Sequence, residues 1–113
     1  SDAVNEVEAA FLSQCGVAVA GMDAFRCAQS AEIRALSSGQ VAELARTHRA
    51  KIENCDALFI SCTNLLTMNE IDGLEAELDV PVVSSNQASL WAALTRLDIT
   101  APAAPGRLFR LAA

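Results

Sequence analysis

A cysteine surrounded by small polar residues is the feature of this sequence best suited to chemistry. Cys62 lies just after a short apolar run and is followed by Thr63 and Asn64, and Ser84 and Ser85 end a second such run. A thiolate is a strong nucleophile and a usable base near neutral pH. Main-chain amides at turns of this kind favour a thiolate and can bind a carboxylate group. These residues are therefore candidates for thiol chemistry on a small carboxylic acid.

The alternative for Cys62 is a structural role, because free cysteine is among the most buried residue types and usually serves packing. Cys15, Cys27 and Cys55 are weaker candidates for chemistry. His48, the only histidine, shares the apolar stripe of its expected helix, which favours a structural role for it as well. One histidine disfavours a Cys/His catalytic pair and excludes a three-histidine metal site, and no Cys-x-x-Cys zinc pattern occurs. The residues themselves thus leave both roles of the thiol open and indicate no metal site.

Length and charge limit the classes of protein to which this chain can belong. Its 113 residues, 52% of them hydrophobic and 19% charged, fit a single globular domain over residues 1–113. A net charge of −6 argues against a nucleic-acid partner, because a phosphate backbone would be repelled. No apolar run approaches the roughly 20 residues of a membrane span, and acidic residues stand where a secretory signal needs basic ones. We therefore expect no membrane partner and a cytoplasmic protein with free thiols.

Helices and strands are expected to alternate along the chain. The spacing of apolar residues predicts helices over residues 2–14, 37–54, 67–78 and 85–97, with a brief helical turn near 32–33. Short apolar runs predict strands over residues 17–22, 57–61 and 81–84. This alternation is typical of a three-layer α/β/α fold with a small parallel sheet. Ligands of such sheets bind beyond the carboxyl ends of the strands, which is where Cys62 and Ser84 stand.

Local signals indicate where these helices begin and which side they bury. Ser37 with Gln40, and Thr67 with Glu70, match the capping-box pattern of a helix N-terminus. The inner face of the last helix is expected to carry four apolar residues, namely Leu90, Trp91, Leu94 and Leu97. A sheet of at least three strands is expected, which is small and indicates that part of the fold lies outside this chain.

Two segments at the expected strand ends carry a family resemblance. Ser-Cys-Thr-Asn-Leu at 61–65 and Pro-Val-Val-Ser-Ser-Asn-Gln at 81–87, with Gly-Arg-Leu-Phe at 106–109, resemble the C-terminal half of a known group of enzymes. These are the maleate cis-trans isomerases and arylmalonate decarboxylases, a branch of the aspartate/glutamate racemase superfamily. The resemblance covers most of the chain and is weak before residue 31. It implies one half of an enzyme with two similar α/β domains, related by a pseudo-twofold axis, with the active site between them.

The resemblance also implies roles for individual residues. In maleate isomerases one thiol adds to the alkene and another acts as acid and then base, whereas racemases move a proton between two thiols. Decarboxylases keep only the cysteine of the second half, and Cys62 matches that position. The main-chain amides of Thr63 and Asn64, and those at Ser84 and Ser85, would hold the substrate carboxylate. No metal or organic cofactor is implied.

Maleate-type isomerisation is the first function that the resemblance implies, because the Thr-Asn-Leu after Cys62 looks more like isomerases than like other members. Ser30 departs from this pattern, since isomerases often have a substrate-contacting asparagine at its position. The alternatives are an amino-acid or hydantoin racemase, an arylmalonate decarboxylase, and a non-catalytic ligand-binding or assembly domain of the same fold. A cysteine in the other half would favour an isomerase or racemase, and its absence would favour a decarboxylase.

Half an active site implies partners. The expected partners are a small carboxylate substrate and the N-terminal domain of the parent protein, and the chain alone is expected to be inactive. Residues 85–113 are expected to pack partly against that domain. Without it, a second copy of the chain would cover Leu90, Trp91 and Leu94, which predicts a homodimer.

Overall fold

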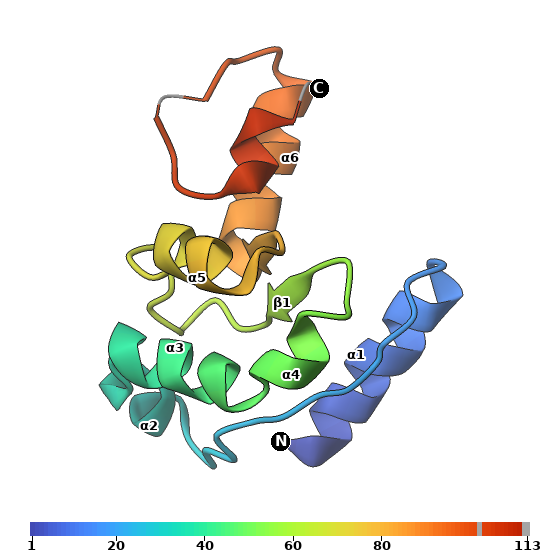
Figure 1. Ribbon diagram of the computed structural model, residues 1–113, viewed down its shortest axis with the longest axis vertical. Coiled ribbons are helices and arrows are strands. Elements are labelled where there is room, and N and C mark those ends of the chain that lie inside the picture. Colours follow the sequence, from blue (N-terminus) through green and yellow to red (C-terminus); the bar gives the residue numbers. More distant parts are fainter. Residues whose placement is uncertain (102, 112–113) are drawn as a thin grey trace.

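The computed structural model of this protein describes residues 1–101 and 103–111 (Figure 1). Within these residues, four helices precede the first strand, and helices and strands alternate only from that strand to the last α-helix. None of the helices in these ranges is long and apolar enough to cross a bilayer. The elements in chain order are α1 (Asp2–Gln14), α2 (Ser30–Ala35), α3 (Ser38–Thr47), α4 (Arg49–Ile52), β1 (Leu58–Ile60), α5 (Ile71–Leu78), β2 (Val82–Ser84), α6 (Ser85–Arg96) and the 3-10 helix η1 (Arg107–Arg110).

The sheet consists of β1 and β2, which pair in parallel. α5 lies in the crossover between them, as a parallel connection requires. Side chains alternate between the two faces, so that Val82 and Ser84 are buried on one face while Phe59 is 45% exposed on the other. The α/β class with a small parallel sheet, expected from the sequence, is therefore confirmed. The register pairs Leu58 with Val82, Phe59 with Val83 and Ile60 with Ser84.

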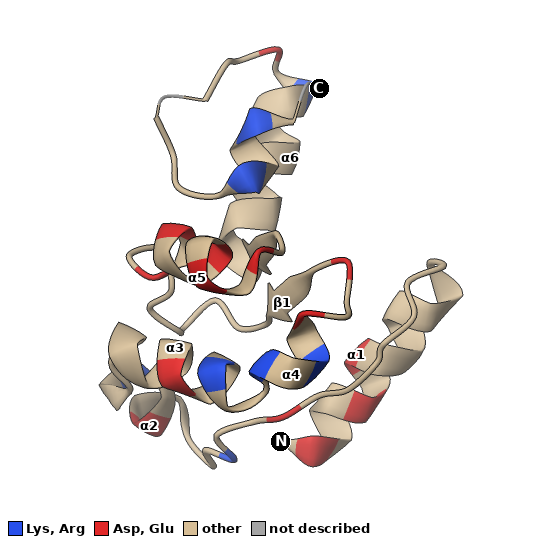
Figure 2. Cartoon of the chain, in the orientation of Figure 1, with Lys and Arg blue, Asp and Glu red and all other residues tan. Residues whose placement is uncertain are grey.

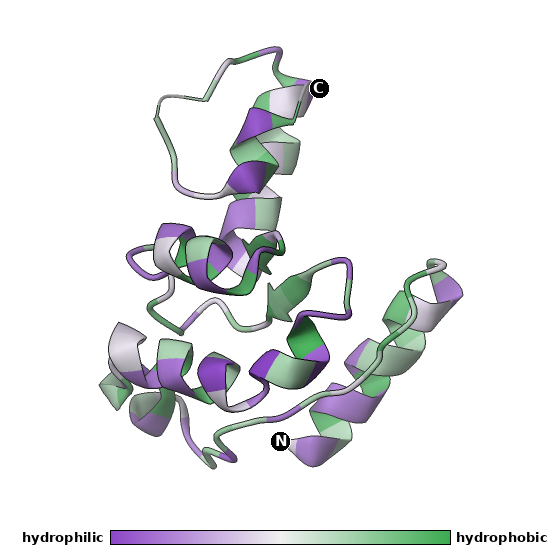
Figure 3. Ribbon diagram, in the orientation of Figure 1, coloured by the Kyte–Doolittle hydropathy of each residue, from purple (hydrophilic) through white to green (hydrophobic). Residues whose placement is uncertain are grey.

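The hydrophobic core lies on the Val82 face of the sheet. α5 contributes Ile71, Leu74 and Leu78, none of which is more than 2% exposed. Each buried side chain of this size stabilises the fold by roughly 1.5–3 kcal/mol. Figure 3 shows the strands as hydrophobic and α5 as mixed, while α1 stands to one side and contributes no buried residue. The remaining core residues are Ala42, Ala45, Ile52, Val80 and Val82, with Leu58 and Ile60 packed against them.

Charged residues connect the helices around this core. Arg46 of α3 donates two hydrogen bonds of 2.8 Å to the carboxylate of Glu77 on α5. The guanidinium lowers the pKa of the Glu77 carboxyl below its ordinary value. Figure 2 shows the same arrangement on a larger scale, with acidic residues along α5 and basic residues on α4 and in the C-terminal tail beside it. Opposite charges thus face one another between elements that are distant in sequence.

The predicted strand over residues 17–22 is not formed. A strand requires a partner for its main-chain hydrogen bonds, and the sheet within the described residues contains only β1 and β2. The segment runs past α4 instead, where a Cβ added to Gly21 would come within 2.9 Å of the Lys51 side chain. Across residues 1–101 and 103–111, the prediction of at least three strands is therefore wrong.

The predicted helix over residues 37–54 and its capping box are confirmed, except that the helix breaks at His48 into α3 and α4. The capping box predicted at Thr67 and Glu70 is wrong. α5 begins after Glu70, whose carboxylate accepts a 2.8 Å hydrogen bond from Ser38 Oγ instead of capping its own helix. A contact with a residue distant in sequence has replaced the local one.

The inner face predicted for the last helix is formed only in part, since Trp91 and Leu94 are half-buried. α6 has the expected position, but Leu90 is 48% exposed and Leu97 is 67% exposed. The buried residue of α6 is Gln87, which is polar. Apolar spacing predicted that Leu90 and Leu97 face the core. They are exposed because no other element in the described part of this chain packs over them.

His48 contacts the loop that precedes α2. Its Nε2 lies 2.7 Å from Asp23 Oδ2, and this hydrogen bond is the main cause of the lowered pKa of the Asp23 carboxyl. Ionised Asp23 therefore stabilises the fold at pH values above its unfolded pKa, and that contribution is lost as the pH falls through the lower folded pKa. We expect His48→Ala to raise the pKa of Asp23 toward its ordinary value. Carbon-13 NMR titration of the carboxyl measures this, with Glu53→Gln as control, and an unchanged Asp23 titration in His48→Ala would contradict it.

Candidate functional site

The two polar turns that follow β1 and β2 lie side by side at one edge of the sheet, because the strands are parallel and in register. The amide of Cys62 donates a 3.2 Å hydrogen bond to Ser85 Oγ. Asn86 Nδ2 donates a 3.1 Å hydrogen bond to the carbonyl of Thr63. These contacts fix the turn after β1 against the beginning of α6. The structure thereby gathers most of the residues singled out in the sequence, namely Cys62, Thr63, Asn64, Ser84 and Ser85.

The backbone of Cys62 has an unusual conformation. Its φ angle is +135°, in a region that glycine tolerates and other residues rarely adopt. Such a conformation costs of the order of 1–3 kcal/mol and persists only where the surroundings impose it. The Cys62 side chain is half-buried at the tip of β1 and not sealed in the core. Backbone strain of this kind concentrates at functional sites, where it aims a side chain.

A glycine at position 62 would relieve this strain. We expect Cys62→Gly to raise the free energy of unfolding by about 1 kcal/mol, because the relief exceeds the roughly 0.5–1 kcal/mol that the freedom of glycine costs. Cys62→Ala keeps the strain and is the matched control. Urea unfolding of both variants measures the difference. A glycine variant less stable than the alanine variant would contradict the strained conformation.

The turn after β1 presents main-chain amides to a ligand. Among the described residues, no hydrogen bond engages the amides of Thr63 and Asn64. Ser85 is the first residue of α6, whose 12 residues align their peptide dipoles and leave a partial positive charge at this end. The edge of the sheet at Cys62 is therefore suited to hold an anion such as a carboxylate.

Ser84 caps α6, whereas the family resemblance implied that its amide binds the substrate carboxylate. Its side chain accepts a 3.2 Å hydrogen bond from the amide of Gln87, and its own amide donates a 2.9 Å hydrogen bond to Gln87 Oε1. Ser84 is 1% exposed, so neither group is open to a ligand in this arrangement. The capping box of α6 uses the amide that the sequence had suggested for substrate binding.

α1 closes one side of this edge through a residue that the sequence did not single out. Ser61 Oγ donates a 2.7 Å hydrogen bond to Glu8 Oε1. A cavity of about 240 Å³ lies beside this contact and combines apolar walls with two hydroxyls and a carboxylate. Glu8 resembles the other acidic residues of α1 in sequence, so no local signal identifies it. The cavity is lined by Glu8, Phe11, Leu12, Phe59, Ser61 and Ser85.

The other candidate residues lie outside this group. Ser30 is the exposed first residue of α2, which lies beside α3, and no hydrogen bond among the described residues joins it to the two turns (Figure 1). His48 pairs with Asp23 and not with Cys62. Its side chain is 45% exposed at the end of α3, so the apolar stripe in which the sequence placed His48 does not extend to it. The remaining free cysteines are Cys15, Cys27 and Cys55.

Comparison with known proteins gives a family match over nearly the whole chain. A model of the arylmalonate decarboxylase family matches residues 1–109. The arylmalonate decarboxylase of Bordetella bronchiseptica is 32% identical over 110 residues, which make up 96% of this chain and 46% of that protein. The chain therefore spans about half the length of the curated relative that it matches.

Solved structures of maleate isomerases share the fold. The maleate cis-trans isomerase of Nocardia farcinica bound to Tris has a TM-score of 0.87 at 28% identity, over 97% of this chain and 45% of that chain. A cysteine-to-serine mutant of this isomerase, with a covalently bound succinylcysteine intermediate, has a TM-score of 0.79 at 28% identity, over 90% of this chain and 42% of that chain. The fold is thus that of one half of such two-domain enzymes.

Proposed function

This chain belongs to the arylmalonate decarboxylase family, and on that premise we propose that Cys62 transfers a proton at a carbon atom next to a carboxylate group. One observation carries the proposal: Cys62 is a half-buried thiol on a strained backbone at the tip of β1, beside main-chain amides. A thiol can give and take a proton near neutral pH without a metal or organic cofactor. The parent protein is then a cofactor-independent isomerase or decarboxylase.

In the isomerase version, which we place first, a thiolate from the other half of the protein adds to one alkene carbon of a cis-dicarboxylic acid. The Cys62 thiol gives its proton to the other alkene carbon, so a saturated thioether forms. After rotation about the new single bond, the Cys62 thiolate takes a proton back and the carbon–sulfur bond breaks. The trans isomer leaves and both thiols return to their starting states. The Thr-Asn-Leu that follows Cys62 supports this version.

In the decarboxylase version, one carboxylate leaves as carbon dioxide and its bonding electrons remain on the substrate as an enediolate. Cys62 then protonates the carbon, and the thiolate regains a proton from solvent. No second thiol is needed. The 32% identity to the arylmalonate decarboxylase of Bordetella bronchiseptica supports this version. A cysteine in the other half of the parent protein would favour isomerisation over decarboxylation.

Substrate binding is the same in both versions. We assign the amides of Thr63 and Asn64, with the Ser85 end of α6, to the substrate carboxylate. These donors also stabilise the negative charge that develops on the enediolate oxygens, because they are already oriented before the reaction. Ser84 holds the turn in place, and Ser30 stays a candidate for substrate contact in the assembled enzyme.

Deuterium incorporation by the full-length parent enzyme tests the proposal. The enzyme is incubated in D2O with maleate or with phenylmalonate. Isomerisation gives fumarate, and decarboxylation gives phenylacetate with one deuterium on the carbon that lost carbon dioxide. Turnover in either case is expected to depend on Cys62. Binding of these acids without any conversion would reject the proposal and favour a ligand-binding domain.

We also propose that α6 faces the other half of the parent protein. Leu90 is 48% exposed, and Trp91 and Leu94 beside it are half-buried. In the isolated chain these apolar side chains favour self-association, so we expect a dimer in sedimentation equilibrium. Leu90→Lys should weaken the dimer, and Asn69→Lys, with the same charge change away from α6, should not. A monomer at high protein concentration would count against this surface.

A further inference from the structure

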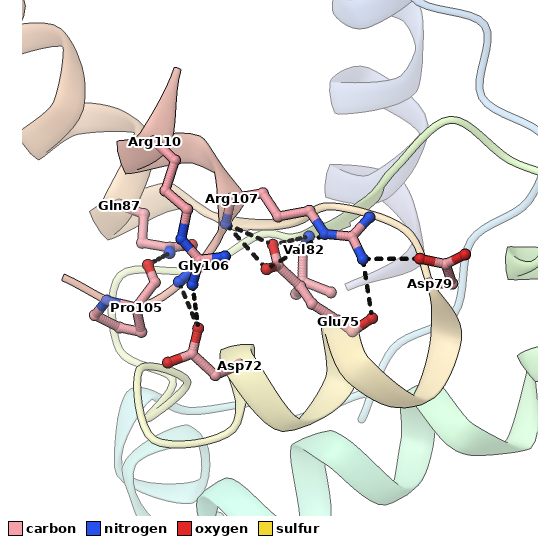
Figure 4. A network of polar contacts seen from close by, with 9 residues as sticks. All are labelled: Asp72, Glu75, Asp79, Val82, Gln87, Pro105, Gly106, Arg107 and Arg110. Carbon is pink, nitrogen blue, oxygen red and sulfur yellow. Dashed lines mark hydrogen bonds and ion pairs between the residues drawn. The ribbon is translucent and has the colours of Figure 1, made fainter. Parts of the chain in front are cut away.

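The C-terminal tail is connected to the strand that leads into the site. We propose that residues 105–107 position the Ser84–Ser85 turn, through Gln87 and Glu75, and thereby set how tightly the site holds the substrate carboxylate. This inference rests on the proposed function, because it assigns the turn to carboxylate binding. Figure 4 shows the polar contacts that carry it.

Gln87 connects the tail to the carboxyl end of β2. Its side chain is fully buried, with 0% exposure. Its Oε1 accepts from the amide of Ser84 at 2.9 Å, and its Nε2 donates to the carbonyl of Pro105 at 2.9 Å. One amide side chain therefore joins the first turn of α6 to the tail. A shift of the tail at Pro105 is transmitted to Ser84 through this single group.

Glu75 connects the tail to the beginning of β2. Its side chain is buried, with 4% of the residue exposed. The carboxylate accepts from the amide of Val82 at 2.9 Å and from the amide of Arg107 at 3.0 and 2.9 Å. A buried carboxylate requires such partners, because an unpaired buried charge is strongly unfavourable. β2 and the tail thus depend on the same anion, and β2 is held at both ends by contacts that include the tail.

Gly106 explains why the tail approaches so closely. Its φ angle is +93°, and a Cβ added there would lie 2.8 Å from Gln87 Nε2 and 2.9 Å from Ile71 Cγ2. Its amide donates a 2.8 Å hydrogen bond to Asp72 Oδ1. Only glycine allows this approach, and any larger residue pushes against the amide that holds Ser84.

The tail-linked contacts are made to the carboxylate-binding turn directly and to Cys62 only indirectly. Gln87 and Glu75 contact Ser84 and Val82, and the amide of Cys62 is reached one residue further on, through Ser85 Oγ. The tail is therefore expected to affect substrate binding more than proton transfer. A change in KM therefore distinguishes a positioning role from a general contribution to stability. Loss of stability alone would lower the amount of active enzyme without raising KM.

Gly106→Ala in the full-length parent enzyme tests the inference. We expect KM for the carboxylic acid to rise about tenfold, the factor that one misplaced hydrogen bond is worth, with kcat changed less than about twofold. Gly73→Ala is the matched control, because a Cβ at Gly73 meets nothing within 4 Å. Gln87→Glu is the second variant, since it keeps the acceptor for the Ser84 amide and removes the donor to Pro105. It remains informative if Gly106→Ala does not fold.

The dissociation constant of malonate, measured by calorimetry in a Cys62→Ser background, gives a readout that does not depend on catalysis. The inference expects weaker malonate binding in Gly106→Ala and in Gln87→Glu than in Gly73→Ala. Lower thermal stability with unchanged KM and unchanged malonate affinity would overturn it and leave the tail a purely structural role. Failure of the proposed function would appear differently, as turnover that does not depend on Cys62.

Discussion

Cys62→Ser is expected to lower kcat of the full-length parent enzyme by about 10³-fold, within the range of 10²–10⁴ that general acid–base catalysis contributes. A serine hydroxyl is a far weaker acid than a thiol, so it supplies the proton poorly at neutral pH. The two side chains differ little in size, and the amide of residue 62 keeps its contact with Ser85 Oγ. The loss therefore reports on the sulfur and not on the fold. Steady-state kinetics with the preferred carboxylic acid measure it.

The control for this experiment is Cys15→Ser, which removes an exposed thiol elsewhere in the chain. It is expected to leave kcat within about twofold of the parent, since a surface substitution of this kind changes little. If the Cys62→Ser and Cys15→Ser enzymes are equally active, the proposed catalytic role of Cys62 is contradicted.

Leu74→Ala is expected to lower the free energy of unfolding of the chain by about 3 kcal/mol, within the 2–5 kcal/mol range of such core truncations. Leu74 is 1% exposed and lies in the centre of the core on α5. Its loss removes buried apolar area and leaves a cavity. Urea denaturation followed by circular dichroism gives the value.

Leu66→Ala is the matched control for that substitution. Leu66 is 63% exposed and lies outside α6, and we expect its truncation to change the free energy of unfolding by no more than about 0.5 kcal/mol. If the two substitutions destabilise the chain equally, the core does not lie where α5 and the strands place it.

The elements whose signals are local could be predicted from the sequence. The bounds of α1 agree with the predicted helix over residues 2–14, because its apolar spacing lies within one segment and Gly16, with a φ angle of +83°, follows it. The capping box predicted at Ser37 and Gln40 is confirmed for the same reason, since its two residues are only three positions apart. The turn at Cys62 and the turn before α6 could be placed together, since parallel strands end at one edge of the sheet.

Features that depend on partners distant in sequence could not be predicted. Residues 17–22 have the composition of a strand, but a strand needs a neighbour that the described part of the chain does not supply. In sequence, Glu75 resembles an acidic residue on the solvent-exposed face of its helix. It is buried because the C-terminal tail folds back onto it, where the amide of Arg107 donates to its carboxylate. The +135° φ angle of Cys62 has no sequence signal either, since it arises from contacts made after the strands pair.

The sequence predicted which candidate residues lie together, but not which of their groups are already engaged within the chain. Cys62, Thr63 and Ser85 lie where the strand ends were expected to bring them. The amide of Ser84 donates to Gln87, which in sequence is only the last residue of the motif at 81–87. Polar residues that follow a strand therefore indicate the edge at which a ligand binds, but not which of their groups stay open.

The rate of iodoacetamide labelling in the full-length parent enzyme at pH 7 tests the central claim most directly. Alkylation requires the thiolate, and mass spectrometry of peptides follows Cys62 and the exposed Cys15 in the same sample. A thiol poised for proton transfer beside main-chain amides predicts that Cys62, although half-buried, reacts at least about tenfold faster than Cys15. Labelling of Cys62 no faster than that of Cys15 would contradict the account.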